Sequence, residues 1–224
     1  GDAGTAKTFL SLACGLEQTV GEDPKYRSML VVRPNVKFDE TVGFLKGSEA
    51  QKINPLIRPI MDNLDQLTAV NSEDYGTKQG MGGKKSKFAT EEAEDKIVAP
   101  NSYAQYLFDS GKIEAQAMEY MRGRSIRDRY MIIDEAQNMT PLQAFGIISR
   151  AGVGTKIILT GDPNQVDNPL LDSKTNGLTY AANAMKGSKV CTQITFEESE
   201  CERSELAKEA IKRMKIKGKG RESR

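Results

Sequence analysis

The sequence predicts an α/β fold in which helices cover both faces of a mostly parallel β-sheet. Short apolar runs at 29–32, 97–99, 130–133 and 157–159 are bounded by polar or turn residues. Runs of this kind are typical of strands buried on both faces. Helical patterns lie between most of these runs, and strands that alternate with helices favour a parallel sheet. A further run at 190–196 alternates and is a weaker strand prediction.

Five segments have the spacing of apolar residues expected of helices. The first follows residue 7 directly, with Leu10, Cys14 and Leu16 among its apolar positions. The five predicted helices cover residues 8–19, 55–67, 103–108, 141–149 and 202–214.

The length of 224 residues suits one domain, which we expect to cover residues 1–214. The periodic pattern disappears over residues 72–95, where a basic, glycine-rich stretch is followed by acidic residues. A loop of this length is a functional insertion or a solvated surface loop, and the sequence leaves both readings open. Residues 215–224 are predicted to be a basic, disordered tail.

Composition excludes several classes of chemistry. The chain has no histidine, so Ser-His and Cys-His nucleophilic pairs are excluded. Three cysteines without Cys-x-x-Cys spacing favour reduced thiols in a cytosolic protein. No apolar run approaches the roughly 20 residues needed to span a bilayer. We therefore expect a cytoplasmic protein with no membrane partner.

The first eight residues match the phosphate-binding pattern G-x-x-x-x-G-K-[ST] at all but one position. They read Gly1, Asp2, Ala3, Gly4, Thr5, Ala6, Lys7 and Thr8, so that an alanine stands in place of the second glycine. In such a loop the backbone amides surround phosphate oxygens, the lysine reaches the β and γ phosphates, and the hydroxyl coordinates Mg²⁺.

Paired acids end the predicted strand at 130–133. Asp134 and Glu135 follow it directly, at the sheet edge where open α/β folds bind ligands. We expect Asp134 to hold Mg²⁺ and Glu135 to orient or deprotonate the attacking water.

A third polar segment follows the strand at 157–159 and reads Thr160-Gly161-Asp162-Pro163-Asn164-Gln165. We expect Gln165 to sense the γ phosphate and Gly161 to permit a sharp turn.

Together with these segments, other motifs resemble the PhoH-like family in residue type and order. They are Arg33-Pro34, Gly43-Phe44-Leu45, Tyr120 to Ser125, Asp134 to Gln137, Leu159 to Gln165 and Glu202 to Ala207. The resemblance extends from Gly1 to about Met214. It implies a RecA-like P-loop core related to superfamily 1 helicases, with ATP hydrolysis as its activity and RNA binding or unwinding coupled to it.

The resemblance also implies roles for single residues. Lys7 and Thr8 would bind phosphate and Mg²⁺, Asp134 would bind Mg²⁺, and Glu135 would be catalytic. Gln165 would be the sensor, and Arg203 would contact the γ phosphate. Arg33, Arg122 and Arg124 match positions of basic residues near nucleotide or nucleic acid in such proteins.

Three expectations concern partners. Single-stranded RNA or another nucleic acid is expected to bind through Lys84, Lys85, Lys87 and the basic tail. The active form is expected to be a homo-oligomer such as a ring, because a single core leaves the γ phosphate open to water. No acidic nuclease cluster is present, so no ribonuclease activity is expected.

Two departures from the family pattern bear on function. The first strand of the sheet should precede the P-loop and is therefore expected to be missing from this chain. Ala6 costs about 1 kcal/mol or more if its φ is positive and little if its φ is helical. The alternative to an ATPase is therefore a nucleotide-gated RNA-binding module with little turnover.

Overall fold

The computed structural model describes residues 5–34, 58–67, 103–121, 123, 125–196 and 200. The predicted strand at 97–99, the loop at 72–95, the helix at 202–214 and the basic tail lie outside the described residues. The fold below refers to the described ranges.

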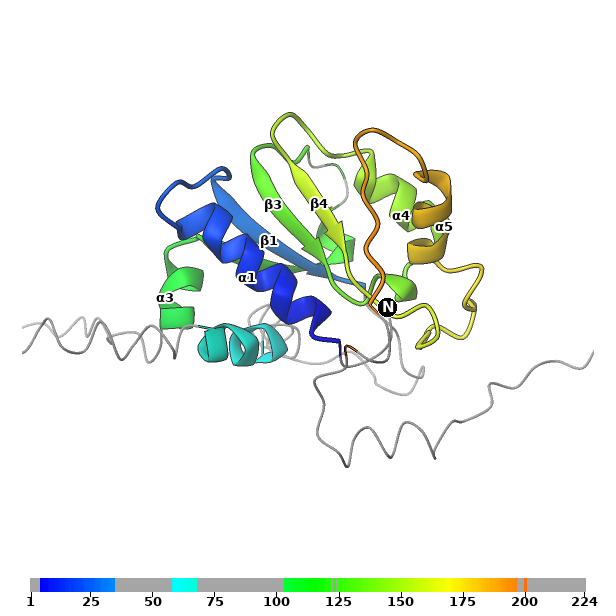
Figure 1. Cartoon of the computed structure of the whole chain (residues 1–224), viewed down its shortest axis with the longest axis horizontal. Coiled ribbons are helices and arrows are strands. Elements are labelled where there is room, and N and C mark those ends of the chain that lie inside the picture. Colours follow the sequence, from blue (N-terminus) through cyan, green and yellow to red (C-terminus); the bar gives the residue numbers. More distant parts are fainter. Residues whose placement is uncertain are drawn as a thin grey trace, which may run out of the picture.

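Four parallel strands form the sheet in the order β2-β1-β3-β4 (Figure 1). In chain order they are β1 (Ser28–Arg33), β2 (Ile113–Ala117), β3 (Arg129–Ile133) and β4 (Lys156–Leu159). Non-sequential neighbours in a parallel sheet require crossover connections, and helices supply them. The α/β class and the parallel sheet are thus confirmed, and the arrangement is that of a RecA-like P-loop core.

Helices cover both faces of this sheet, as predicted (Figure 1). One face carries α1 (Lys7–Val20), a helix that includes residues 58–67, and α3 (Tyr103–Asp109). The other face carries two short 3₁₀ helices and two α-helices. These are η1 (Met118–Met121), η2 (Ala136–Asn138), α4 (Pro141–Ile148) and α5 (Gly177–Ala184).

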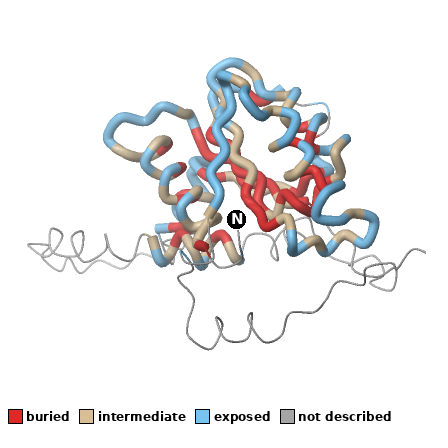
Figure 2. The backbone as a smooth tube through the Cα atoms, turned by 45° about the vertical axis from the view of Figure 1, so that its right-hand side comes forward, coloured by how far each residue is buried: buried red, intermediate tan, exposed pale blue. Residues whose placement is uncertain are grey.

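The apolar core lies in two layers, one on each side of the strands, and Figure 2 shows the buried strands in the middle of the molecule. Successive strand residues point to opposite faces. Met29 and Val31 therefore pack under α1, whereas Leu30 and Val32 pack under α4 and η2. This division explains why the central strands β1 and β3 have apolar runs rather than alternating sequences.

Local sequence signals set the starts of two helices. Thr140 accepts a hydrogen bond from the Gln143 backbone, and the Gln143 side chain accepts one from the Thr140 backbone, which forms a capping box before α4. Asn176 caps α5 by accepting a hydrogen bond from the Thr179 backbone. By contrast, α1 begins at Ala6 with no side-chain cap.

Three of the predicted strands and the helices at 8–19, 103–108 and 141–149 are confirmed, with small shifts at their ends. The helix predicted at 55–67 is confirmed over its described part, 58–67. The weaker strand at 190–196 is wrong: this segment has no regular structure, and Val190 and Ile194 are 88% and 74% exposed. Without burial of one face, alternation alone does not make a strand. Strand β2 and helix α5 were not predicted.

Within the described ranges, no helix is both long and apolar enough to cross a membrane.

Candidate active site

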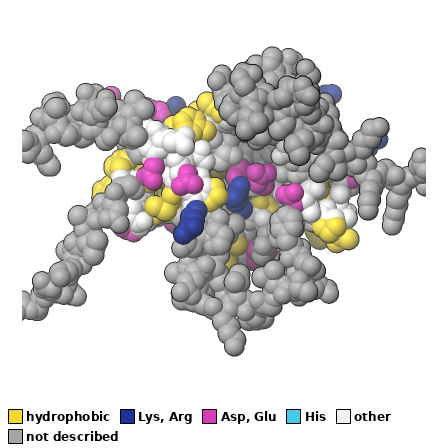
Figure 3. Space-filling model, turned by 90° about the horizontal axis from the view of Figure 1, so that it is seen from below, with side chains coloured by type: hydrophobic (Ala, Val, Ile, Leu, Met, Phe, Trp, Pro, Cys, Tyr) yellow, Lys and Arg dark blue, Asp and Glu magenta, His cyan; other side chains and the backbone are white. Residues whose placement is uncertain are grey.

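A pocket of about 270 Å³ lies where the start of α1 meets the carboxyl ends of β3 and β4. It is lined by Thr5, Ala6, Lys7, Thr8, Phe9, Asn63, Asp134, Glu135, Gly161, Asp162 and Gln165. Figure 3 shows this end of the molecule from below, with basic and acidic side chains close together near the middle of the described surface. In open α/β sheets this edge is where ligands bind.

The start of α1 has the properties of an anion site. Its first turn contains no acidic residue and its N-cap, Ala6, contributes no side-chain hydrogen bond. The first amides of a helix lack partners within the helix and carry the positive end of its dipole. Lys7 adds a full positive charge there, with its Nζ 3.2 Å from Thr5 Oγ1. Phosphate groups are the ligands that this combination favours.

Ala6 itself has a left-handed backbone, with φ 50° and ψ 25°. Of the two conformations considered from the sequence, the structure therefore has the costly one. A left-handed residue with a Cβ costs roughly 1–2 kcal/mol relative to the right-handed conformation. The backbone at this position has a conformation that glycine adopts without cost, so Ala6 is strained there.

Asp134 connects the phosphate-binding loop with the end of β3. Its side chain is almost fully buried, and Oδ1 accepts hydrogen bonds from Thr8 Oγ1 at 2.7 Å and from Thr160 Oγ1 at 2.9 Å. Arg33 Nε lies 3.0 Å from Asp134 Oδ2, but its N–H forms no hydrogen bond, so this contact is an ion pair only. The buried carboxylate is thus held by two hydroxyls and one cation.

Glu135 is more open than its neighbour, with 44% of its side chain exposed. Its Oε2 accepts a 2.6 Å hydrogen bond from Gln137 Nε2, and its Oε1 lies 3.6 Å from Arg33 Nη2. The backbone of Glu135 is left-handed, with φ 54°. Non-glycine residues in this conformation often lie at functional sites, where surrounding contacts hold the strain.

The segment after β4 forms the far wall of the pocket. Gly161, Asp162 and Gln165 line it, and the Gln165 backbone donates to the Asp162 carbonyl at 3.0 Å. Gly161 was expected to make a sharp turn, but its φ is not positive. Its need for glycine has another cause: an added Cβ would lie 2.2 Å from Gln137 Oε1.

The structure brings together seven of the residues singled out from the sequence. The residues that border one pocket are Thr5, Ala6, Lys7, Thr8, Asp134, Glu135 and Gln165. Arg33 also reaches the site, through its contacts with both acids. Residues 1–4, Arg122, Arg124 and Arg203 lie outside the described residues.

Sequence reasoning missed Phe9 and Asn63, and it quoted Gln137 and Thr160 within motifs without giving either a role. Thr160 had a usable signal, because it follows a buried strand as Asp134 does. Asn63 had none, since it comes from a helix whose approach to the pocket depends on tertiary packing.

The oxygen ligands around Asp134 fit Mg²⁺. Magnesium is usually bound by one or two carboxylates together with phosphates and water, rather than by an all-protein cage. Thr8 Oγ1 and Asp134 Oδ1, which are 2.7 Å apart, offer a hydroxyl and a carboxylate oxygen at one point. Among the described residues no group of three or more His, Cys, Asp or Glu side chains is arranged to hold a metal, as expected for this type of site.

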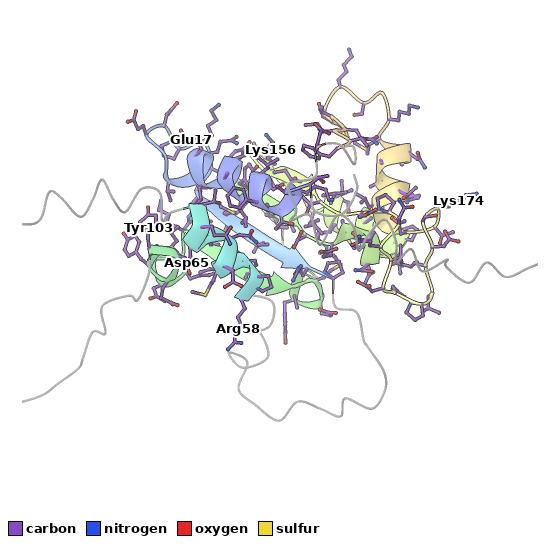
Figure 4. All side chains as sticks on the ribbon, turned by 60° about the horizontal axis from the view of Figure 1, so that its bottom comes forward. Glu17, Arg58, Asp65, Tyr103, Lys156 and Lys174 are labelled. Carbon is purple, nitrogen blue, oxygen red and sulfur yellow. The ribbon has the colours of Figure 1, made fainter. Side chains whose placement is uncertain are left out.

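A second, larger pocket of about 490 Å³ lies between α4 and α5. Pro141, Tyr180 and Ala184 are among its lining residues. Lys174, which also borders it, lies well away from Arg58 of the 58–67 helix and from Tyr103 of α3 (Figure 4). None of the residues expected to carry chemistry lines it.

Comparison with known proteins agrees with the motifs. A family model described as PhoH-like protein matches residues 1–215. The chain is 38% identical over 208 residues to "Protein PhoH2" of Bacillus subtilis (strain 168), covering 92% of this chain and 40% of that protein. It is 29% identical over 211 residues to the "PhoH-like protein" of the same organism, covering 94% of this chain and 55% of that protein. It is 28% identical over 213 residues to "Protein PhoH" of Escherichia coli (strain K12), covering 94% of this chain and 50% of that protein.

The chain spans about half the length of these relatives. The match nevertheless includes the P-loop, the paired acids and the segment after β4, which are the parts that form the pocket. The fold and these motifs suggest that the pocket binds a nucleotide with Mg²⁺. The chain belongs to the PhoH-like protein family.

Proposed function

We propose that this chain binds ATP with Mg²⁺ at the carboxyl edge of its sheet and hydrolyses it. One observation carries the proposal. Thr8 Oγ1 donates a 2.7 Å hydrogen bond to Asp134 Oδ1, although the two residues are 126 positions apart. This contact joins the phosphate-binding loop to the acidic strand end, which are the two parts that jointly hold Mg²⁺ in P-loop enzymes.

Each group in the pocket has a role in this proposal. The first amides of α1 and Lys7 bind the phosphates, and Thr8 with Asp134 holds the metal. When bound, Mg²⁺ neutralises charge that develops on the phosphate oxygens. Glu135 accepts a proton from the attacking water or orients it, since it is the more exposed of the two acids. Gln165, at the opposite wall, is proposed to sense the γ phosphate.

The alternative is a nucleotide-gated module with little turnover, and the left-handed Ala6 favours it. Strain of about 1–2 kcal/mol in the loop corresponds to roughly a tenfold loss if binding has to maintain it. A loss of that size weakens nucleotide binding but does not remove the groups that act on water. We therefore place hydrolysis first.

Coupling to RNA and assembly into a homo-oligomer are further parts of the proposal, and they rest on the resemblance of the motifs. The basic residues proposed to bind single-stranded RNA, including Lys84, Lys85 and Lys87, lie outside the described residues. Arg203, also outside them, is proposed to reach the γ phosphate of a neighbouring subunit. An arginine supplied in this way can raise turnover by about 10³-fold or more.

Measuring phosphate release and ATP binding on the same sample tests the central proposal. We expect release that requires Mg²⁺ and that is absent from Lys7→Ala protein. Tight ATP binding without release above the Lys7→Ala background would favour the gated module instead. Absence of both binding and release would refute the nucleotide site.

Mixing inactive variants tests the proposed role of Arg203. Subunits with Arg203→Ala and subunits with Lys7→Ala should regain part of the ATPase activity when combined, if the arginine acts across a subunit boundary. A parental rate for Arg203→Ala alone and no recovery in the mixture would leave the arginine without a part in hydrolysis.

A further inference from the structure

A buried glutamine connects the two walls of the pocket. Gln137 lies in η2 and is 0% exposed. Its Nε2 donates to Glu135 Oε2 at 2.6 Å and to the Gln165 carbonyl at 3.0 Å. Its Oε1 accepts from the Asp162 backbone N–H at 3.2 Å. One side chain therefore contacts both the acid proposed to act on water and the loop that carries Gln165.

The hydrogen-bond partners fix the orientation of this amide. A glutamine side chain offers two N–H donors and one carbonyl acceptor. At Gln137 both donors face acceptors, a carboxylate and a carbonyl, while the oxygen faces an N–H. Rotating the amide by 180° would place its oxygen against two acceptors and its nitrogen against a donor. In a buried position each such mismatch is costly, so only one orientation is compatible with the surroundings.

Gly161 makes room for this connection. A Cβ at Gly161 would lie 2.2 Å from Gln137 Oε1 and 3.0 Å from Leu178 Cδ2. Any larger residue would push the glutamine amide away from the Asp162 backbone. The glycine at this position and the glutamine in η2 therefore serve the same contact.

The next residue, Asn138, binds a later part of the same loop, at Asp167 and Asn168. It is 4% exposed, and its Oδ1 accepts from the backbone N–H groups of Asp167 at 2.8 Å and Asn168 at 3.3 Å. Its Nδ2 donates to Asp167 Oδ2 at 3.2 Å. None of these hydrogen bonds involves Glu135. The side chains of Gln137 and Asn138 thus both anchor the loop after β4. Of the hydrogen bonds made by these two side chains, only those of Gln137 also reach Glu135.

We propose that Gln137 is a positioning residue that fixes the Glu135 carboxylate relative to the loop carrying Gln165. The inference rests on the proposed function, because positioning matters only if Glu135 and Gln165 act on the nucleotide. Gln137 holds Oε2, which leaves Oε1 as the oxygen next to Arg33. A displacement of the 161–165 segment is transmitted to the carboxylate through this amide. Hydrolysis and the position of this loop are thereby coupled in both directions.

Steady-state kinetics with matched variants test the coupling. Gln137→Ala should lower kcat for ATP by about 10- to 100-fold, because small displacements of a catalytic group have effects of this size. Its ATP dissociation constant should stay within about threefold, since the phosphate-binding groups are untouched. Asn138→Ala removes the contacts to Asp167 and Asn168 but leaves those between Gln137 and the 161–165 segment, so it should change kcat by less than about threefold. Equal losses in the two variants, or an unchanged kcat for Gln137→Ala, would overturn the proposal.

A near-isosteric variant separates positioning from general loss of structure. Gln137→Glu keeps the shape of the side chain but replaces the Nε2 donor with an acceptor that faces Glu135. It should lower kcat at least as far as Gln137→Ala does while the ATP dissociation constant stays within about threefold. A parental kcat for Gln137→Glu would count against the coupling, because the donor would then have no part in hydrolysis.

Amide hydrogen exchange provides a readout that does not need ATP hydrolysis. Gln137→Ala should accelerate exchange at Asp162, which loses its acceptor, and in the residues next to Glu135. Asn138→Ala should accelerate exchange at Asp167 and Asn168 without affecting the residues next to Glu135. If the parent protein does not hydrolyse ATP, the proposed function fails, and this comparison still decides whether Gln137 couples the two walls. The same exchange pattern in both variants would overturn the coupling.

Discussion

The two faces of the sheet are packed with different side chains. Under α1, the Tyr130 ring meets Tyr26 edge to face at 5.6 Å, and Gly15 lies so close that an added Cβ would be 2.9 Å from this ring. The other face is rich in methionine. Among the described residues, the core there contains Met118, Met121, Met131 and Met139 together with aliphatic residues and no aromatic ring.

This difference corresponds to what each face supports. The α1 face carries the helix whose start is proposed to bind phosphates, and close contact between rigid groups fixes that helix. The methionine-rich face carries η2 and the segment after β4, which are proposed to respond to the nucleotide. Methionine side chains are flexible and tolerate repacking. We therefore expect the methionine-rich face to allow small movements more readily than the face under α1.

The largest expected effects come from one substitution on each face, and they act on different steps: one on ATP binding and the other on hydrolysis. Lys7→Ala, at the start of α1, should abolish measurable ATP binding because it removes the charge that neutralises the phosphates. Glu135→Gln, beside η2, should preserve binding and lower hydrolysis by about 10²- to 10⁴-fold. Calorimetry and a phosphate-release assay measure the two quantities. Parental hydrolysis by the Glu135→Gln protein would remove Glu135 from the mechanism.

Two glycines in helices compare how tightly the faces are packed. Gly15→Ala should lower the free energy of unfolding by about 1–3 kcal/mol, because the new methyl group meets Met29 and the ring of Tyr130. Gly146→Ala in α4 has nothing within 4 Å and should raise it by about 0.4–1 kcal/mol through helix propensity. Urea unfolding measures both changes. Equal effects would mean that α1 is not packed more tightly than α4.

Ala6→Gly tests whether the backbone strain at the start of α1 weakens ATP binding. Glycine adopts φ 50° readily, so the substitution should relieve about 1 kcal/mol and increase ATP affinity by up to about fivefold. Titration of ATP with parent and variant provides the comparison, with Lys7→Ala as the protein that should not bind. An unchanged affinity would indicate that bound and free loops share the strain equally.

The effect that is smallest at neutral pH concerns the ionisation of Tyr130, because it appears only at high pH. Burial raises the pKa of Tyr130 to about 12, with smaller contributions of the same sign from Cys14 and Tyr26. An unfolded tyrosine titrates near about 10, so the folded state binds the proton more tightly. Stability should therefore be complete below pH 10 and fall as the pH rises from about 10 towards 12. Relative to the parent, Tyr130→Phe should lose less stability over this interval in urea unfolding. If the stability of the parent and of Tyr130→Phe falls equally with pH, ionisation of the Tyr130 hydroxyl does not contribute to the loss.

Apolar runs in the sequence predicted most of the described strands and helices. Strand β2 and helix α5 were not predicted, and each omission has a physical reason. Strand β2 has the sequence Ile-Glu-Ala-Gln-Ala, which alternates apolar and polar residues, but alanine and glutamate are depleted in strands and the alternation is therefore a weak signal. Its place in the sheet comes from its pairing with β1. Helix α5 is short and carries only a moderate apolar pattern, although Asn176 gave a capping signal that was not used.

The site was predictable where residue type determines chemistry and unpredictable where neighbours determine shape. A lysine, a hydroxyl and two acids in the right order indicated Lys7, Thr8, Asp134 and Glu135 without coordinates. The conformation of Ala6 was left open because φ depends on the surrounding contacts. The crowding at Gly161 also could not be predicted from the sequence, since the Gln137 side chain beside it comes from η2.

Strand β4 forms one edge of the sheet within the described residues, and its Ile157, Ile158 and Leu159 are only partly buried. An extended segment that pairs with β4 would lengthen the sheet and cover these three side chains. Amide hydrogen exchange in β4 at several protein concentrations identifies the source of such a segment. Exchange that slows with concentration would show that a second molecule supplies it, and exchange that does not depend on concentration would leave this edge to the chain itself.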